Sequence, residues 1–328
     1  MLDVFRNDAF SAVSLTAAIL KAPYKPSRIG QLGLFREKGI TTTTVVIEEK
    51  DGALELIPSS PRGGPAENLG PQRRTARAFV VPHYEKDSTI YADSVQNVRA
   101  FGSDDQLQGV QALVDERLAI LRAQHEVTLE WQRMGAIRGQ ILDADGSVMF
   151  DLFDEFGVAQ QTMVIDIGAD DVRNQAVAAQ RLIEDELGAE PVTGYRGFCG
   201  DHFFDELIAA EAVRESVKFQ ESNTLRTDLR KGFEYGGVVW ENYRGRVSGQ
   251  DFVGNGDCYL VPEGTSIFQT AFAPADFLEA VNTVGLPIYV KQAPDPSGLN
   301  RFVRLHSQSN PLALNTRPRA VVKLTISS

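Results

Sequence analysis

Residues 119–146 read AILRAQHEVTLEWQRMGAIRGQILDADG and carry the strongest structural signal of the chain. Apolar side chains recur at three- and four-residue spacing through this stretch and upstream of it, which predicts one helix over about 103–138. At 1.5 Å per residue the helix is roughly 50 Å long, so we expect it to cross a whole domain or to back a sheet. The Asp145-Gly146 pair then predicts the turn of a β-hairpin within residues 137–153.

Two apolar stripes follow one another along the predicted helix. Ser103 supplies an N-cap, and acidic residues in the first turn favour the helix dipole. We expect Leu118, Leu121 and Trp131 to be the main packing residues of this helix. The first stripe consists of Leu107, Val110, Val114, Leu118 and Leu121, and the second of Ile120, Val127, Trp131 and Met134.

Composition excludes several classes of protein. The 328 residues carry a net charge of −11, which is a poor basis for wrapping nucleic acid, because phosphate binding needs clustered Lys and Arg. Two cysteines do not make a disulfide framework and suit a reducing cytoplasm. The sequence contains no apolar run near the ~20 residues that a membrane span needs and no signal-peptide pattern at its start.

The first 90 residues predict an arm followed by a projecting hairpin. Residues 1–40 are net positive, with six basic and three acidic side chains, and contain one helix at 10–20. The β-branched run at 41–47 predicts a strand, and Asp51-Gly52 predicts a tight turn into a returning strand at 53–57. Such a hairpin is marginal in water without a neighbour.

A long irregular segment, residues 58–77, follows this hairpin. It contains Arg62, Arg73, Arg74 and Arg77 against the single acid Glu67. Its length and Pro/Gly content are unusual for an ordinary connection. We therefore consider two interpretations: a solvated loop, or a basic surface that docks on the acidic body of an identical neighbour.

The remainder predicts an α+β protein without the regular strand–helix alternation of a doubly wound sheet. From 139 to 171 the chain holds eight acidic residues and no basic one. The predicted helices are 170–187, 201–219 and 275–284, and the predicted strands are 78–84, 235–241, 257–261, 266–270, 287–292 and 320–326.

Candidate catalytic and metal-binding patterns are weak. Cys199 and His202 could form a nucleophile pair, but Asp201 explains the same segment as a helix N-cap. Asp143 and Asp145 resemble the start of a calcium loop whose later ligands are absent, and a hairpin turn accounts for them. The four histidines lie in separate segments, and no phosphate-binding or dinucleotide fingerprint occurs. We therefore expect no catalytic residue, no metal and no cofactor.

Taken together, segments along the whole chain resemble the lambda-type major capsid protein E family of tailed bacteriophages. The matching segments are Tyr91–Gly102; His125, Thr128, Glu130, Gly135, Gly139 and Asp145-Gly146; Gly200, Phe203, Phe204, Leu207 and Val213-Arg214-Glu215; Phe233, Gly236-Gly237, Glu241, Tyr243 and Gly245; Phe268, Ala273–Asp276, Asn282-Thr283, Gly285 and Tyr289; and Ser309–Leu312 with Arg317-Pro318.

The resemblance implies the tailed-phage major capsid protein fold, which is shared with encapsulins. The implied parts are an N-terminal arm at 1–42, an extended loop at 43–90, a peripheral domain at 91–193 with the long spine helix and the 137–153 hairpin, an axial domain at 194–293, and a C-terminal return to the peripheral domain at 294–328.

The implied function is that of a shell subunit and not of an enzyme. Copies of the chain would form the hexamers and pentamers of an icosahedral head around DNA, which they would enclose without specific binding. Arg62, Arg73, Arg74 and Arg77, with Glu67, would then make contacts between subunits. The expected partners are a separate scaffolding protein, since no scaffold-like segment precedes the arm, a portal, and a decoration protein, but no membrane. The expected location is the virion, after assembly in the bacterial cytoplasm.

Two other classes remain open from the sequence. One is an encapsulin-like compartment shell, which has the same fold but a cargo enzyme inside. The other is a soluble α+β hydrolase that uses Cys199 and His202.

Overall fold

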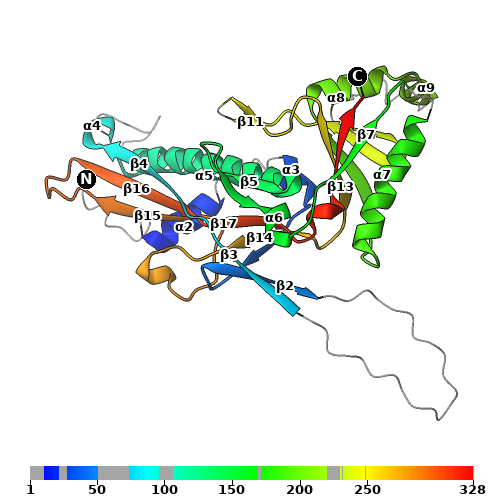
Figure 1. The fold of residues 1–328 in the computed structure, drawn as a ribbon. Coiled ribbons are helices and arrows are strands. Elements are labelled where there is room, and N and C mark those ends of the chain that lie inside the picture. Colours follow the sequence, from blue (N-terminus) through cyan, green and yellow to red (C-terminus); the bar gives the residue numbers. More distant parts are fainter. Residues whose placement is uncertain are drawn as a thin grey trace, which may run out of the picture.

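The computed structural model describes residues 11–21, 28–50, 74–95, 106–168, 171–219, 230, 232–247 and 249–327. Helices and strands mix along this part of the chain, which confirms the α+β class. The molecule has a sheet-and-helix body at one end and a long helix running toward the other end. A two-stranded β-ribbon projects away from both (Figure 1).

A six-stranded mixed sheet forms the body at one end (Figure 1). Its aromatic core is formed by fully buried side chains that include Phe198, Phe203, Phe204 and Trp240. The strand order is β7 (Gln161–Ile165), β18 (Val322–Ile326), β13 (Asp257–Glu263), β8 (Gly194–Cys199), β10 (Val238–Asn242) and β9 (Phe233–Tyr235). Helix α7 (Val172–Leu187) contacts strands β7, β13 and β18 of this sheet. Helices α8 (Asp201–Ala209) and α9 (Glu211–Phe219) follow strand β8 in the chain.

The long helix α5 runs from Gln106 to Arg138 and connects the body to a second layer. At its first half lies a three-stranded antiparallel sheet, in which β16 (Phe302–Ser309) pairs with both β15 (Tyr289–Pro294) and β4 (Tyr84–Tyr91). Helix α2 (Ala12–Lys21) packs there against α5 and β15. The buried cluster of this region comprises Leu15, Ile19, Ile90, Val114, Leu118, Leu121, Ile288, Val290 and Leu305.

The second half of α5 lies against smaller elements. A three-stranded sheet joins β1 (Arg36–Gly39), β14 (Phe268–Phe272) and β17 (Pro311–Asn315), and α3 (Arg28–Leu32) precedes β1. Directly after α5 comes the hairpin of β5 (Gln140–Leu142) and β6 (Val148–Asp151), followed by α6 (Leu152–Phe156). The short elements are α4 (Ala92–Val95), β11 (Arg246–Val247), β12 (Gln250–Asp251), η4 (Leu278–Ala280) and η5 (Pro318–Ala320).

Gly139 makes the change of direction between α5 and the hairpin. Its φ is +86°, and a Cβ built there would lie 2.1 Å from the ring of Phe153. Both the left-handed backbone and the lack of space therefore require glycine.

The projecting ribbon pairs β2 (Thr44–Lys50) with β3 (Arg74–Val80) in antiparallel register (Figure 1). Phe79 is buried on the face toward the body, where its ring contacts Phe150 and Phe156. Val46 and Val80 lie on the opposite face and are 58% and 64% exposed. Apolar side chains thus lie on both faces of the ribbon, and the described residues cover only one of these faces.

Several local predictions are wrong. The single helix expected at 201–219 is two helices, because Ala210 adopts extended ψ (132°) between them. The strand expected at 235–241 is a hairpin that turns at Gly236 and Gly237, both with positive φ. The helix expected at 275–284 is only the 3₁₀ turn η4. β2 pairs with β3, whereas the tight turn expected at Asp51-Gly52 and the strand expected at 53–57 lie outside the described residues and stay predictions.

The predicted domain boundaries stay a prediction. The six-stranded sheet takes β7 from the range expected to be peripheral, four strands from the range expected to be axial, and β18 from the C-terminal return.

Candidate functional site

The described residues offer no ordinary catalytic centre. No group of three or more His, Cys, Asp or Glu side chains that could hold a metal occurs among them. None of the helices in this part of the chain has the length and apolarity to cross a membrane. Cys199 is fully buried with its Sγ 3.4 Å from that of Cys258, whereas His202 is exposed and lies 4.0 Å from Glu206. The structure therefore does not bring Cys199 and His202 together as a nucleophile pair.

The acidic turn after α5 is a hairpin turn and not a calcium loop. Asp145 accepts a hydrogen bond from the backbone N–H of Ser147 at 2.8 Å, and Asp143 accepts one from Ala144 at 2.7 Å. Hydrogen bonds from the Ser147 side chain and then from its backbone N–H lower the pKa of the exposed Asp145 carboxyl. Both side chains thus satisfy their own turn, as is usual for Asp in such positions.

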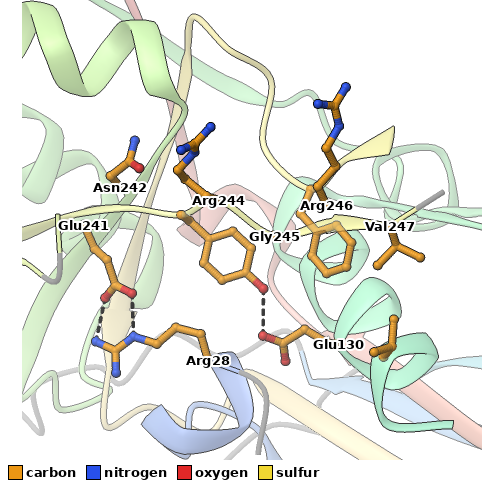
Figure 2. A pocket seen from close by; sticks show the side chains of 11 residues that line it. Arg28, Glu130, Glu241, Asn242, Arg244, Gly245, Arg246 and Val247 are labelled. Atoms are coloured by element: carbon orange, nitrogen blue, oxygen red, sulfur yellow. Dashed lines mark hydrogen bonds and ion pairs between the residues drawn. The ribbon is translucent and has the colours of Figure 1, made fainter. Parts of the chain in front are cut away.

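A buried ion-pair network joins the segment before β1 to the six-stranded sheet (Figure 2). Glu241 of β10, which is 4% exposed, receives two hydrogen bonds from the guanidinium of Arg28, Nε to Oε1 at 2.5 Å and Nη2 to Oε2 at 2.7 Å. Arg196 of β8 reaches the same carboxylate at 3.0 Å and also pairs with Glu263 of β13 at 2.5 Å. Paired charges of this kind replace the water that burial removes.

Glu130 connects α5 to the same place. It is 3% exposed, and its Oε1 accepts the backbone N–H of Ile29 at 2.8 Å. The same oxygen accepts the hydroxyl of Tyr243 at 2.7 Å (Figure 2). Burial and the neighbouring Glu130 carboxylate raise the pKa of Tyr243 far above its ordinary value. We call the set Arg28, Glu130, Arg196, Glu241, Tyr243 and Glu263 the junction. It fixes α3, the long helix and three strands relative to one another.

An open cleft of about 410 Å³ lies beside the junction, between α5 and the chain after β10 (Figure 2). Its apolar wall includes Val127, Val247 and Phe252. Two exposed arginines on its border pair with carboxylates of the same chain: Arg244 with Asp201 at 3.2 Å, and Arg246 with Asp251 at 3.1 Å. The arrangement orders the surface and presents no pair of groups arranged for acid–base or nucleophilic chemistry.

A second buried cation ties α5 to β1. Arg133 is 2% exposed, pairs with Glu37 at 2.6 Å, and stacks over the ring of Phe35 at 5.6 Å. Glu130 and Arg133 are three residues apart on the helix and share one face. Charged residues on a helix face that also buries Met134 indicate buried ion pairs, and the prediction from sequence missed this signal.

The predicted packing residues of α5 lie in two places. Leu118 and Leu121 are buried in the cluster with α2, at the first half of the helix. Trp131 is partly buried near the second half, where its Nε1 donates to the carbonyl of Leu142 at 3.0 Å. Its ring lies 5.1 Å from that of Phe252 and beneath the guanidinium of Arg138 at 4.8 Å.

Of the five residues predicted to make subunit contacts, the structure describes the side chain of one. Arg77 is partly buried, stacks over the ring of Phe156 at 5.0 Å, and donates to the Phe156 carbonyl at 3.5 Å. Arg74 is the first residue of β3, and its side chain lies outside the described part. Arg62, Glu67 and Arg73 also lie outside the described residues.

Exposed apolar side chains gather at a second place besides the ribbon. The loop between β14 and β15 exposes four large apolar residues within nine positions. They are Leu278 (91% exposed), Val281 (56%), Val284 (60%) and Leu286 (38%). Concentrated exposure of this kind marks contact surfaces more often than isolated apolar residues do.

Three comparisons, with a family model, with curated proteins and with solved structures, agree on the kind of protein that this chain is. The family described as "Phage major capsid protein E" matches residues 11–326. The major capsid protein of Pseudomonas phage KPP10 is 28% identical over 340 residues, which cover 96% of each chain. The major capsid protein of Salmonella phage Felix O1 is 25% identical over 361 residues, which cover 98% of each chain.

A solved structure, the putative capsid protein of a prophage of Escherichia coli CFT073, superimposes with a TM-score of 0.57. It covers 97% of this chain and 99% of its own, at 12% sequence identity, so it shows the fold alone. The expected tailed-phage capsid fold is therefore confirmed. The match of the family over residues 11–326 shows more: the chain belongs to the phage major capsid protein E family and is a structural protein, not an enzyme.

Proposed function

We propose that copies of this chain form the hexamers and pentamers of an icosahedral head shell that encloses the DNA of a tailed phage. Family membership supplies the role of shell subunit. Copies of one subunit that form both six-membered and five-membered rings can close a shell through repeated heterologous contacts. The hexamers and pentamers are therefore a finer proposal about that role. The compartment-shell alternative gains no support, since the curated relatives that match nearly the full chain are phage major capsid proteins.

The observation that carries the proposal is the uncovered face of the ribbon. Val46 and Val80 are more than half exposed on a two-stranded element whose other face already packs on its own body. A two-stranded ribbon is marginal in water unless a further layer covers it. A neighbouring copy would supply that layer, and the exposed loop at 278–286 is a second surface for the same purpose.

The basic residues of the extended loop support a more specific form of the proposal. Arg62, Arg73, Arg74 and Arg77 would pair across subunit boundaries, with Glu67 as the acid of the same segment. Contacts of opposite charge orient subunits and exclude wrong neighbours more than they add affinity. Their small contributions add up over the many contacts of a shell. Arg77 would keep its stacking on Phe156 in such a contact.

The acidic stretch 139–171 suggests where packaged DNA would lie. We propose that this stretch faces the inside of the shell, where repulsion would let DNA slide without specific binding. We further propose a separate scaffolding protein, a portal and a decoration protein as partners, with assembly in the bacterial cytoplasm and no membrane.

Particle formation tests the proposal directly. The chain, expressed with and without a scaffolding protein, should form closed particles of uniform diameter in negative-stain images and mass measurement. Changing Arg73 and Arg74 together to Glu should leave a folded subunit that forms no shells. Normal particles from that double variant would refute the contact assignment, and a stable monomer from the unchanged chain under all conditions would refute the shell itself.

A further inference from the structure

Two buried thiols lie opposite each other at the centre of the six-stranded sheet. Cys199 is the last residue of β8 and Cys258 the second residue of β13, and the register pairs them directly. Both are free and 0% exposed, and their Sγ atoms are 3.4 Å apart. The junction, the cleft and the proposed contact surfaces use neither of them.

The backbone places this pair where a cross-strand bond needs no movement of the chain. The N–H of Gly200 donates to the carbonyl of Asp257 at 2.9 Å. A bond from the residue after one cysteine to the residue before the other is the mark of a non-hydrogen-bonded antiparallel pair. In such pairs the Cα atoms are typically about 4.5 Å apart and the side chains approach most closely. A disulfide requires about 4.4–6.8 Å between Cα atoms, so the backbone already meets its condition.

The surroundings hold the two sulfurs together and make their oxidation slow. Gly197 lies two residues before Cys199, and a Cβ there would come within 3.1 Å of the Cys258 Sγ and 2.8 Å of the Trp240 ring. The missing side chain thus leaves the space that the Cys258 thiol fills. Burial, followed by the neighbouring Cys199, raises the pKa of the Cys258 thiol, so little of the nucleophilic thiolate is present.

We propose that Cys199 and Cys258 are an oxidation site that forms an intrachain disulfide between β8 and β13. The oxidant class is a small hydroperoxide, of which hydrogen peroxide is close to water in size. One thiol loses its proton and attacks a peroxide oxygen; the O–O bond breaks, giving a sulfenic acid and one water. The second thiol then displaces the hydroxyl as a second water, and the S–S bond forms. Two thiols and one peroxide thus give one disulfide and two waters, and the two electrons pass from sulfur to peroxide.

The bond would lock the part of the chain that carries α8, α9, β9 and β10, because these elements lie between positions 199 and 258. Closing this loop restricts the unfolded chain and thereby stabilises the fold. If the proposed function holds, the subunit passes from a reducing cytoplasm into a particle outside the cell, where peroxide is no longer removed by cellular thiols. The disulfide itself does not depend on that function.

The test treats the purified full-length chain with hydrogen peroxide and then counts thiols after unfolding in denaturant without reductant. The expected result is loss of both thiols, an intact mass lower by two hydrogens, a cross-linked peptide joining the two cysteine segments, and no covalent dimer. The thermal midpoint should rise by about 5 °C or more and return to its first value after dithiothreitol. Two thiols that persist while the partly buried Met149 and Met163 are oxidised, or a bond between chains, would overturn the proposal.

The single variants Cys199→Ala and Cys258→Ala provide the matched control. Each keeps one buried thiol, so peroxide should add oxygen to it or leave it unchanged, and the thermal midpoint should not rise. A rise of equal size in either variant would mean that the stabilisation has another source. If a variant fails to fold, the intact mass of the unchanged chain and the reversal of its thermal midpoint by dithiothreitol still decide whether the disulfide forms. Particle formation before treatment is scored separately, so failure of the shell proposal and failure of this one remain distinguishable.

Discussion

The junction and the ribbon each depart from the usual rule in opposite ways, because the junction buries charged side chains and the ribbon exposes apolar ones. At the junction, Glu241 and Glu130 are 4% and 3% exposed, and their partners belong to the same chain. On the ribbon, Val46 and Val80 remain more than half exposed on a face that no described part of the chain covers. We infer that the first region makes the subunit rigid before assembly, and that the second gains its stability from a neighbour.

Among changes to charged residues, the largest loss of subunit stability should come from Glu241→Ala. The change removes the carboxylate that Arg28 and Arg196 share, although Arg196 keeps Glu263. Removing one partner of a buried pair costs about 3–5 kcal/mol. We expect the lower end, about 3 kcal/mol, since the Arg28 side chain is 37% exposed. Denaturant unfolding of the unassembled subunit measures it.

The control for this change is Asp251→Ala, because Asp251 and Arg246 form an ion pair with side chains 56% and 66% exposed. An exposed pair contributes only about 0–1 kcal/mol. Equal losses in the two variants would contradict the role assigned to the junction.

Acid should destabilise the subunit through His125 on α5. This buried ring bonds to Ser307 Oγ at 2.9 Å, and burial lowers its pKa from 6.5 to about 4. The unfolded chain therefore binds the proton first, so the stabilising contribution is complete above pH 6.5 and is lost as the pH falls toward 4. Full loss amounts to about 3 kcal/mol. The difference in unfolding free energy between the unchanged chain and His125→Gln should shrink over that range, and parallel pH profiles would show that His125 is not the group responsible.

Trp131→Phe should have an intermediate effect. It removes the hydrogen bond to the carbonyl of Leu142 and part of the contact with Phe252 and Arg138. An unpaired carbonyl and a smaller ring together cost about 2 kcal/mol. Thermal unfolding measures the loss. A change below the error of the method would mean that Trp131 does not anchor the long helix to the hairpin.

The smallest effect on the isolated subunit should come from Val46→Asp on the ribbon. The side chain is already 58% exposed, so its replacement should change the unfolding free energy by no more than about 0.5 kcal/mol. Phe79→Ala, on the covered face of the same ribbon, should cost about 3 kcal/mol or more. Similar losses for both would mean that the isolated chain covers the outer face as well.

The sequence was sufficient to predict the α+β class and the long helix, because apolar periodicity and a change to hairpin signals are local properties of residues 103–153. Strand pairing was harder to predict from the sequence. Asp51-Gly52 is a strong local turn signal, yet β2 pairs with a strand that begins at Arg74, because tertiary packing on Phe150 and Phe156 determines the register.

The junction could not be predicted from local pattern. Arg28 and Glu241 are separated by 213 positions, and nothing near either residue indicates the other. Glu130 and Arg133 offered a weak signal, as charges on a buried helix face need partners. The basic residues of the extended loop were recognised by composition, but composition does not identify the surface on which they dock.

The most direct test of the account is the assembly of the double variant Val46→Asp/Val80→Asp, followed by sedimentation velocity and negative-stain microscopy. Subunits of the aspartate variant should keep their thermal midpoint and form no shells, while the uncharged control Val46→Thr/Val80→Thr should still assemble. Normal shells from the aspartate variant would contradict the claim that a neighbouring copy covers this face of the ribbon.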